Sequence, residues 1–399
     1  HCVLSYHFLR IKKRFFRFFN YYKIGGKMFK CKNCNSYQKR YIGYLDNQPY
    51  CRKCILLKEK TFEVKNYQPN KEYHAKLTYD LTKTQQKAAQ EILSFIKQGK
   101  SVLVDAVCGA GKTEIVYTTI EYFLNQGKKI GFTIPRKDVV IELYHRLKKD
   151  YPQVDVIAVY GNHTQKLEGQ IIVLTTYQLY RYHQHFDLLI LDEADAFPFY
   201  NRLFLKRSCK GPIIYLSATF NTWYLKKIPQ QVQVHRRFHN VDLPIPKIIL
   251  TLPFLQNKYL IQSLKKFKAI KKQVLIFVPT IFIGKALAKK LTIPFVYAGL
   301  SSKQQIVDDF KNKQFSFLLT TTILERGITI DDIQVIIYQA EHYLFDLKTL
   351  VQICGRVGRK KAHPNGEIIF ICSQKTLAIK SCLKTLKSKN NCLHKNNGS

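Results

Sequence analysis

Two short stretches that lie far apart in the chain have the residue types and spacing of a nucleoside triphosphate site. Residues 106–113 read AVCGAGKT, and residues 352–359 read QICGRVGR. In the first stretch, glycines allow backbone N–H groups to turn toward phosphates. Lys112 would neutralise the β- and γ-phosphates, and the hydroxyl of Thr113 would bind Mg²⁺. The pattern predicts an ATP-binding loop that follows a buried strand and leads into a helix beginning near Gly111.

The second stretch supplies two arginines three residues apart, Arg356 and Arg359. At that spacing both side chains lie on one face of a helix. From there they can contact the γ-phosphate across a cleft and stabilise charge in the transition state, which is the role of arginine fingers. A basic surface helix is the alternative, and Gln352 and the two glycines of the stretch, Gly355 and Gly358, argue against it. A phosphate loop on one domain and an arginine pair on another would place ATP at a domain interface, where hydrolysis can move the domains.

Acidic and hydroxyl side chains follow two other apolar runs. Asp192 and Glu193 come directly after the run at residues 188–191. A carboxylate at the end of a strand can bind Mg²⁺ and the next one can orient water, so we assign Asp192 to Mg²⁺ and Glu193 to water activation. A solvated acidic turn is the alternative. A second group at a strand end is assigned to coupling this cluster with a nucleic-acid surface: Ser217, Ala218 and Thr219.

Further candidates complete the nucleotide site. Gln85 precedes the phosphate loop and is the candidate for adenine recognition. Ala106 stands where the strict loop pattern has glycine, a change that the chemistry tolerates. The predicted nucleotide-binding residues are Gln85, Gly109, Ala110, Gly111, Lys112, Thr113, Glu114 and Gly327.

The charge of the chain points to a polyanionic partner. Its 399 residues include 65 Lys and Arg against 27 Asp and Glu, a formal charge of +38. A genome biased toward lysine explains part of this excess but not the shortage of acids, and arrays of cations bind phosphate backbones. An anionic membrane surface is the alternative partner, notably for the basic aromatic residues 1–25. No apolar run approaches the ~18–20 residues of a membrane span.

Four of the 11 cysteines form two Cys-x-x-Cys pairs separated by sixteen residues. The ligands would be Cys31, Cys34, Cys51 and Cys54, a spacing that predicts one structural Zn²⁺ with four thiolates. Such a pattern suits a reducing compartment rather than a disulfide scaffold. Tyr41 and other rings between the pairs could stack single-stranded bases, or the metal could only hold a small module together.

The elements that position these residues are read from apolar runs. Short uninterrupted runs suit parallel strands that are buried on both faces, and they alternate with helical stretches in two successive blocks. The strands are expected at residues 101–105, 129–134, 154–160, 171–174, 188–191 and 213–216, and then at 274–278, 295–297, 317–319, 335–338 and 368–371. The fold class is therefore α/β, with two tandem parallel-sheet domains after a small four-cysteine zinc module. The expected boundaries are 1–25 for a basic aromatic segment, 26–60 for the zinc module, 61–78 for a linker, 79–243 and 244–386 for the two domains, and 387–399 for a frayed basic tail, with a hinge near residues 243–246.

The order of these motifs resembles that of superfamily 2 DEAD/DEAH-type helicases and translocases over roughly residues 79–375. More narrowly, the chain resembles the ComFA late-competence proteins. Three features carry that likeness: the cysteine module directly before the motor, the sequence DAFPF after the acidic motif, and TTILERGIT at residues 321–329. That family more often has Asp-Glu-Val-Asp where this chain has Asp-Glu-Ala-Asp.

The resemblance implies a function. The domains would be RecA-like, and single-stranded DNA would run across both of them while ATP, Mg²⁺ and Zn²⁺ are bound. Its phosphates would be held by Pro135, Arg136, Thr175, Thr176, Thr320, Thr321 and Thr322. ATP hydrolysis would drive transforming DNA through the uptake channel during competence. Partners would be a phosphoribosyltransferase-like competence protein and a DNA-loading protein. The location would be the cytoplasm, peripheral at the inner face of the cell membrane, and homo-oligomerisation stays open.

Two kinds of alternative remain open from the sequence. Within the helicase class, the chain could be a replication-restart DNA helicase or an RNA helicase. Outside that class, it could be a zinc-dependent nucleic-acid-binding protein with a vestigial motor. The presence of Lys112, Asp192, Glu193 and both arginines argues against the second alternative.

Overall fold

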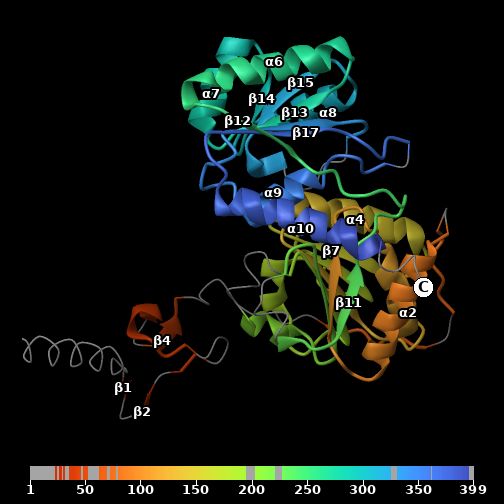
Figure 1. The fold of residues 1–399 in the computed structure, drawn as a ribbon. Helices are drawn as coiled ribbons and strands as arrows, with labels where there is room; N and C mark the ends of the chain where they lie inside the picture. The colour runs from red at the N-terminus through yellow and green to blue at the C-terminus, as the bar shows by residue number, and fades with distance from the viewer. Residues whose placement is uncertain are drawn as a thin grey trace, which may run out of the picture.

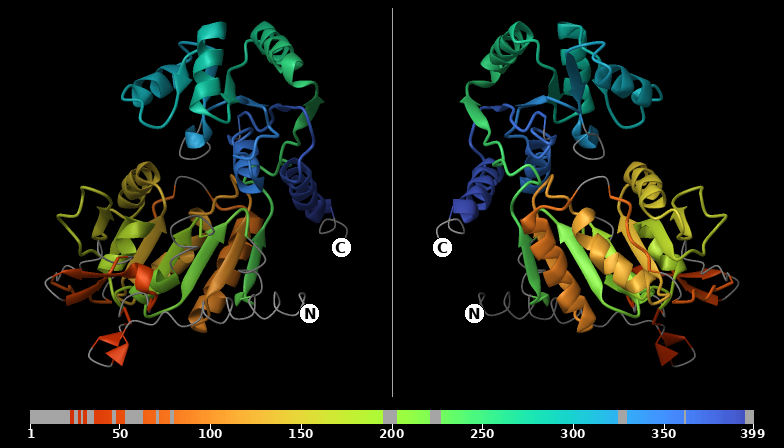
Figure 2. Two further views of the ribbon diagram at one scale, coloured as in Figure 1. Left: turned by 90° about the vertical axis from the view of Figure 1, so that its left-hand side faces the viewer. Right: turned by 90° about the vertical axis from the view of Figure 1, so that its right-hand side faces the viewer.

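The computed structural model places two parallel β-sheets one above the other, each with helices packed on it (Figure 1). It describes residues 23–24, 27–28, 30–31, 36–45, 48–52, 63–69, 72–77, 80–194, 203–220, 227–324, 330–360 and 362–394. Both views in Figure 2 show the first domain below and the second above. The two tandem α/β domains predicted from the sequence are confirmed.

The first sheet has seven strands, all parallel, in the order β11-β5-β10-β9-β6-β8-β7. The strands are β5 Val102–Ala106, β6 Ile130–Ile134, β7 Val156–Val159, β8 Ile171–Thr175, β9 Leu188–Asp192, β10 Ile213–Ser217 and β11 Gln231–Val234. The helices around them are α2 Lys83–Lys97, α3 Tyr117–Leu124 and α4 Lys137–Asp150, with 3₁₀ turns η3 Glu114–Val116, η4 Thr176–Arg181 and η5 Leu203–Ser208. Six of these strands lie where the apolar runs predicted them. β11 was not predicted, because its alternating polar residues do not form an apolar run.

The second sheet has six parallel strands in the order β12-β17-β16-β13-β15-β14. The strands are β12 Lys247–Leu250, β13 Val274–Phe277, β14 Phe295–Val296, β15 Phe317–Thr320, β16 Gln334–Tyr338 and β17 Ile368–Cys372. The other elements are α6 Gln256–Ala269, α7 Ile281–Leu291, α8 Lys303–Lys311, α9 Leu347–Cys354 and α10 Leu377–His394, with the 3₁₀ turns η6 Pro253–Leu255 and η7 Thr322–Leu324. All five predicted strands are present, and β12 is an additional edge strand.

Burial of the central strands explains why apolar runs located them. Every residue of β6, β8 and β10 is buried, as is every residue of β16 and β17. A strand covered by helices on both faces has no side for polar residues, so its sequence is continuously apolar. Parallel strands also bring their carboxyl ends to one edge of the sheet, which gathers the motif residues that follow them.

Helix α10 corrects the expectation of a frayed tail after residue 386. It continues to His394, packs on α9 and lies between the two domains (Figure 1). Lys389 Nζ donates to Asp105 Oδ1 at 2.8 Å and to the carbonyl of Ala218 at 2.8 Å, both in the first domain. The Asn390 side chain bonds both the N–H and the carbonyl of Leu243, at 2.9 and 3.0 Å. The expected hinge near residue 243 is therefore tied to α10.

The segment before the first domain is docked on it rather than free. The Tyr67 hydroxyl donates to Asp155 Oδ2 at 3.1 Å, and the N–H of Tyr73 donates to Asn125 Oδ1 at 2.7 Å. These bonds fix the expected linker along the surface of the first domain.

The cysteine module is described only in part. Its described part contains the hairpin of β3 Ile42–Leu45 with β4 Gln48–Cys51 and the turn η2 Lys39–Tyr41. A second hairpin, β1 Lys23–Ile24 with β2 Lys27–Met28, crosses the expected boundary at residue 26. Cys31 and Cys51 are buried, whereas Cys34 and Cys54 lie outside the described residues. Among the described residues there is no cluster of three or more candidate metal ligands, so zinc stays a prediction. The basic segment at residues 1–22 also lies outside the described part of the chain.

None of the described helices combines the length and the apolar character needed to cross a bilayer.

Candidate nucleotide site between the two domains

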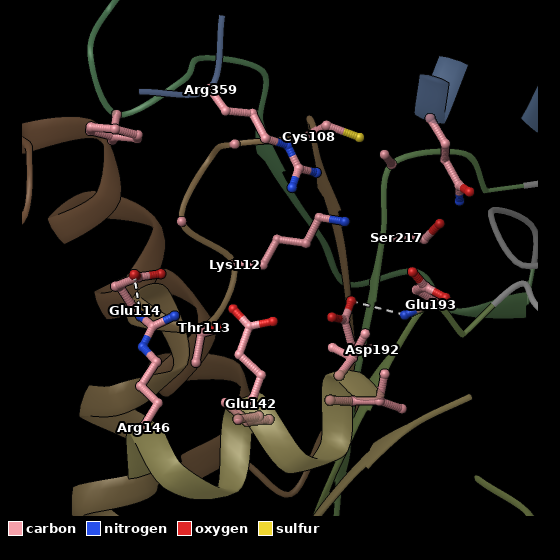
Figure 3. A pocket seen from close by; sticks show the side chains of 18 of the residues that line it. Cys108, Lys112, Thr113, Glu114, Glu142, Arg146, Asp192, Glu193, Ser217 and Arg359 are labelled. Carbon is pink, nitrogen blue, oxygen red and sulfur yellow. Dashed lines mark hydrogen bonds and ion pairs between the residues drawn. The ribbon is translucent and has the colours of Figure 1, made fainter. Parts of the chain in front are cut away.

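A cavity of about 360 Å³ lies between the carboxyl edge of the first sheet and the turn after α9 (Figure 3). It is lined by residues from both domains, so the arrangement expected from the sequence is present in space. The predicted residues that line it are Gly109, Gly111, Lys112, Thr113, Glu114, Asp192, Glu193, Ser217, Ala218, Arg356 and Arg359.

The phosphate loop follows β5 and depends on two glycines in the left-handed region. Gly109 has φ of 84° and Gly111 has φ of 77°. A β-carbon at Gly111 would also collide with the side-chain amide of Gln85. The helix after the loop does not begin at Gly111, as expected. A turn at Lys112 and the 3₁₀ turn η3 come first, and α3 starts at Tyr117.

Gln85 supports the loop from behind. It is the third residue of α2, where its side chain accepts from the N–H of Thr82 at 2.9 Å in a capping box. Its Nε2 donates to the carbonyl of Ala110 at 3.0 Å, and only 5% of the residue is exposed. Gln85 is not among the residues that line the cavity. Its assignment to adenine stays a prediction, and the contact that the structure describes is with the loop.

The acidic pair stands at the end of β9, opposite the phosphate loop in the cavity (Figure 3). Glu193 has φ of 53°, and its N–H donates to Asp192 Oδ1 at 2.9 Å. A residue other than glycine is strained in this conformation, and such strain is concentrated at functional sites. Ser217 ends the neighbouring strand β10, and its hydroxyl accepts from the N–H of Thr219 at 3.0 Å.

The two arginines do not share a helix, contrary to expectation. Helix α9 ends at Cys354, and residues 355–358 form a turn. The side chain of Arg359 folds back so that its Nε donates to the carbonyl of Gly355 at 3.0 Å. Both arginines still line the cavity, because the turn rather than the helix directs them.

The pKa of the Cys108 thiol shows the effect of the cations around this cavity. Burial by itself would raise the pKa of its thiol, but the cations of Lys112 and Arg359 outweigh burial and hold that pKa below its ordinary value. Burial and the neighbouring Arg359 also lower the pKa of Arg356. Cations gathered around one cavity favour a polyanion such as a triphosphate.

Sequence reasoning missed cavity residues that come from α4 and from the stretch after β11. Glu142 and Arg146 line one wall of the cavity, and Phe238 lines another. Arg146 forms an ion pair with Glu114, so the predicted nucleotide contact of Glu114 competes with a protein partner. Neither segment carries a motif, and only the pairing of β11 with β5 brings Phe238 to the loop.

The candidate nucleic-acid residues are placed unevenly. Thr175, Thr176 and Thr320 are buried, and the Thr176 hydroxyl is bonded to that of Thr133 at 3.0 Å. Burial argues against direct contact of these three side chains with a strand. Arg136 is half-buried and donates to the carbonyl of Ile323 at 3.1 Å, across the domain interface. The remaining candidates are partly exposed, namely Pro135, Thr321 and Thr322. Gly327, a predicted nucleotide-binding residue, lies outside the described residues.

The donor set fits Mg²⁺ bound beside a triphosphate. Thr113 offers a hydroxyl and Asp192 a carboxylate, and both line the same cavity (Figure 3). Oxygen ligands of this kind, few in number and completed by phosphate and water, are what Mg²⁺ prefers.

Comparison with known proteins agrees with this geometry. Residues 78–222 match the family described as type III restriction enzyme, res subunit, and residues 256–361 match the helicase conserved C-terminal domain. The competence protein ComFA of Streptococcus pneumoniae is 33% identical over 398 residues, which is 92% of this chain and 91% of that protein. ComFA of Bacillus subtilis is 32% identical over 405 residues, 93% of this chain and 88% of that protein.

Among solved structures, S. cerevisiae Dbp5 bound to RNA and ADP BeF3 aligns with a TM-score of 0.59 at 18% identity, over 78% of this chain and 88% of that one. At such low identity the likeness concerns the fold alone, and it matches the pair of parallel-sheet domains.

Proposed function

The chain belongs to the ComFA family of competence proteins, and from that premise we propose that it drives single-stranded DNA into the cell during transformation. It is a nucleic-acid-dependent ATPase of the helicase and translocase class, which uses ATP and Mg²⁺. The finer proposal concerns the direction of this activity: hydrolysis moves a single strand across both domains toward the cytoplasm.

One observation carries the proposal of a motor. The same cavity is lined by Lys112 of the first domain and by Arg356 and Arg359 of the second. A triphosphate held by all three groups would bind the domains together, and its cleavage would weaken that link. A binding protein without a motor would not need cations from two domains at one phosphate.

The residues of the cavity have distinct proposed roles. Backbone N–H groups of the phosphate loop and the ammonium of Lys112 bind and orient the phosphates. Glu193 accepts a hydrogen bond from the attacking water and takes its proton. Arg356 and Arg359 stabilise the charge that develops on the transferred phosphoryl group. Thr113 and Asp192 would hold Mg²⁺, which neutralises phosphate charge when it is bound.

The DNA substrate is proposed from charge and from the family. A formal charge of +38 suits a partner that is a continuous polyanion. Contacts through Arg136, Thr321 and Thr322 would be sequence-independent, as transport of any strand requires. The same proposal includes a zinc module in this chain. It also includes three partners: a channel at the inner face of the membrane, a phosphoribosyltransferase-like competence protein and a DNA-loading protein.

The test is a comparison of nucleic acids as activators. We expect single-stranded DNA to stimulate phosphate release more than duplex DNA or RNA of equal length and at equal salt. Stimulation by RNA above that by DNA would favour an RNA helicase, and preference for a branched duplex would favour a replication-restart helicase.

Lys112→Ala identifies the ATPase site. The substitution removes the cation that binds the phosphates, so hydrolysis should fall to the background rate while binding of labelled single-stranded DNA persists. Lys100→Ala, which changes an exposed lysine before β5, is the matched control and should keep the parent rate. Retained hydrolysis in Lys112→Ala would remove the site assignment.

A further inference from the structure

We propose that Arg237 is a positioning residue that holds the arginine turn of the second domain against the phosphate loop of the first. The inference deepens the proposed function and rests on it, because it concerns the same cavity. Residues 237–239 are called the clasp below.

The clasp is fixed to the phosphate loop by strand pairing. β11 lies beside β5 in parallel register, with Val234 opposite Ala106. The two segments that follow these strands continue side by side, and the N–H of Phe238 donates to the carbonyl of Gly109 at 3.3 Å. Arg237 therefore starts from a position that the phosphate loop itself determines.

Across the interface, Arg237 contacts the backbone between the two arginine fingers. Its Nη1 donates to the carbonyl of Val357 at 2.7 Å and to that of Gly358 at 2.6 Å. His239 Nε2 lies 2.8 Å from the same Gly358 carbonyl. Gly358 has φ of 66°, and a β-carbon there would collide with the carbonyl of Pro364. The turn therefore requires glycine at position 358, and residues 237–239 contact it at its centre.

The burial of Arg237 shows that this contact is costly. Only 2% of the residue is exposed, and within the described part of the chain its Nε and Nη2 have no hydrogen-bond partner. Burial also lowers the pKa of Arg237 to about 10. A buried cation with unsatisfied donors destabilises a fold, so such groups are expected at functional sites.

Arg237 acts through its neighbours and not on the nucleotide. It is absent from the residues that line the cavity, whereas Phe238 is among them. The carbonyls that it binds belong to Val357 and Gly358, and the residues on either side of that pair are Arg356 and Arg359. Placing those carbonyls places both guanidinium groups. When the domains separate the clasp is broken, so the fingers are aligned only in the closed protein.

Arg237→Ala should reduce the turnover number rather than ATP affinity. Misplacing a catalytic group by about 1 Å costs ~10²-fold in rate, so we expect kcat with single-stranded DNA to fall by about 10–100-fold. KM for ATP should change by less than about threefold, because the substrate contacts remain. Arg237→Lys should recover part of kcat, since an ammonium can donate to the same carbonyls. Arg236→Ala removes the same charge one residue earlier and should keep the parent kcat.

A double substitution separates positioning from a merely structural role. Arg237→Ala should lower kcat by a smaller factor in an Arg359→Ala protein than in the parent, because one of the two fingers that Arg237 positions is already absent there. Additive losses would overturn the inference, as would an Arg237→Ala protein with parent kcat and a lowered melting temperature. If Arg237→Ala does not fold, Arg237→Lys and His239→Ala give the same test. Failure of the ATP site itself would appear separately, as retained hydrolysis in Lys112→Ala.

Discussion

At the level of single residues, the cavity combines cations from two domains with the acidic pair Asp192 and Glu193 and with two further carboxylates on its wall, Glu114 and Glu142. Lys112, Arg356 and Arg359 converge there, and they lower the pKa of Cys108 although burial opposes this. The cations repel one another when no anion is present. Binding of a triphosphate relieves that repulsion, which gives the ligand a direct electrostatic reason to close the domains.

Arg359→Ala should separate ATP binding from hydrolysis. The phosphate loop remains, so affinity for a fluorescent ATP analogue should be nearly unchanged. Loss of an arginine finger lowers kcat by ~10³–10⁵-fold. Lys360→Ala is the control, because Lys360 is exposed and its ammonium pairs with Asp331 at 2.6 Å. Hydrolysis by Arg359→Ala at the parent rate would exclude the finger role.

The sequence identified cavity residues where a motif carries the chemistry. Lys112 and Asp192 follow buried apolar strands, so both their type and their position could be read directly. Arg237 could not be found this way, because its role depends on the pairing of β11 with β5 and on a contact with a distant turn. The helix expected at Arg356 was wrong for a local reason: α9 ends at Cys354, and Gly358 takes a left-handed conformation with φ of 66° that no helix contains.

At the level of elements, α10 joins the second domain to the first. Its buried residues Ile379, Cys382 and Leu386 recur at helical spacing, and the same face continues to Lys389 and Asn390. The apolar pattern stops before the polar end of the helix, which is why the sequence indicated a frayed tail. Lys389 continues the buried face of the helix because its ammonium is bonded to a carboxylate and to a carbonyl.

Lys389→Ala should destabilise the closed protein. It leaves Asp105 without its ammonium partner, and we expect a loss of about 2 kcal/mol at pH 7, the scale of a charge-assisted hydrogen bond. Burial tends to raise the pKa of Asp105, but His235 and Lys389 together keep it below its ordinary value. A carboxyl group with a depressed pKa stabilises the fold above its unfolded pKa of about 3.9, and this contribution disappears as the pH falls through the folded pKa.

The measurement is denaturant unfolding of parent and variant between pH 7 and pH 3. The difference between them should begin to shrink below the unfolded pKa of about 3.9 and should disappear as the pH passes through the depressed pKa of folded Asp105. Lys387→Ala, two residues earlier on the exposed side of α10, should unfold like the parent. A difference that does not change with pH would show that the bond to the Ala218 carbonyl, and not the ion pair, carries the stability.

At the level of the whole molecule, the two sheet domains are expected to act as a unit that does not require the cysteine module. Each sheet has its own buried strands and helices, whereas the described part of the module is a short hairpin and a turn. Modules of that size depend on a metal for their fold. The order of the domains could be predicted from the sequence because the cysteine pairs mark the module and two successive blocks of apolar runs mark the two sheet domains.

Removal of the predicted zinc should therefore affect DNA stimulation and not basal hydrolysis. Cys31→Ser combined with Cys51→Ser should lower the zinc content, measured by atomic absorption, from one ion per chain toward zero. Basal phosphate release should persist. Activation by single-stranded DNA should weaken, as expected for a module that contacts the strand. Cys209→Ser, in the first domain, is the control. Full zinc content in the double variant would contradict the four-cysteine assignment.

Helix α10 also makes the conformational cycle observable in solution. The helix packs on α9 of the second domain, and its Lys389 is bonded to Asp105 in β5 of the first domain. Separation of the domains must therefore change the distance between the C-terminal end of α10 and β5. A donor dye at position 387 and an acceptor dye on an exposed site of the first domain would follow that distance by fluorescence energy transfer. Each turnover could then be counted in single molecules while a strand is moving, without any label on the DNA.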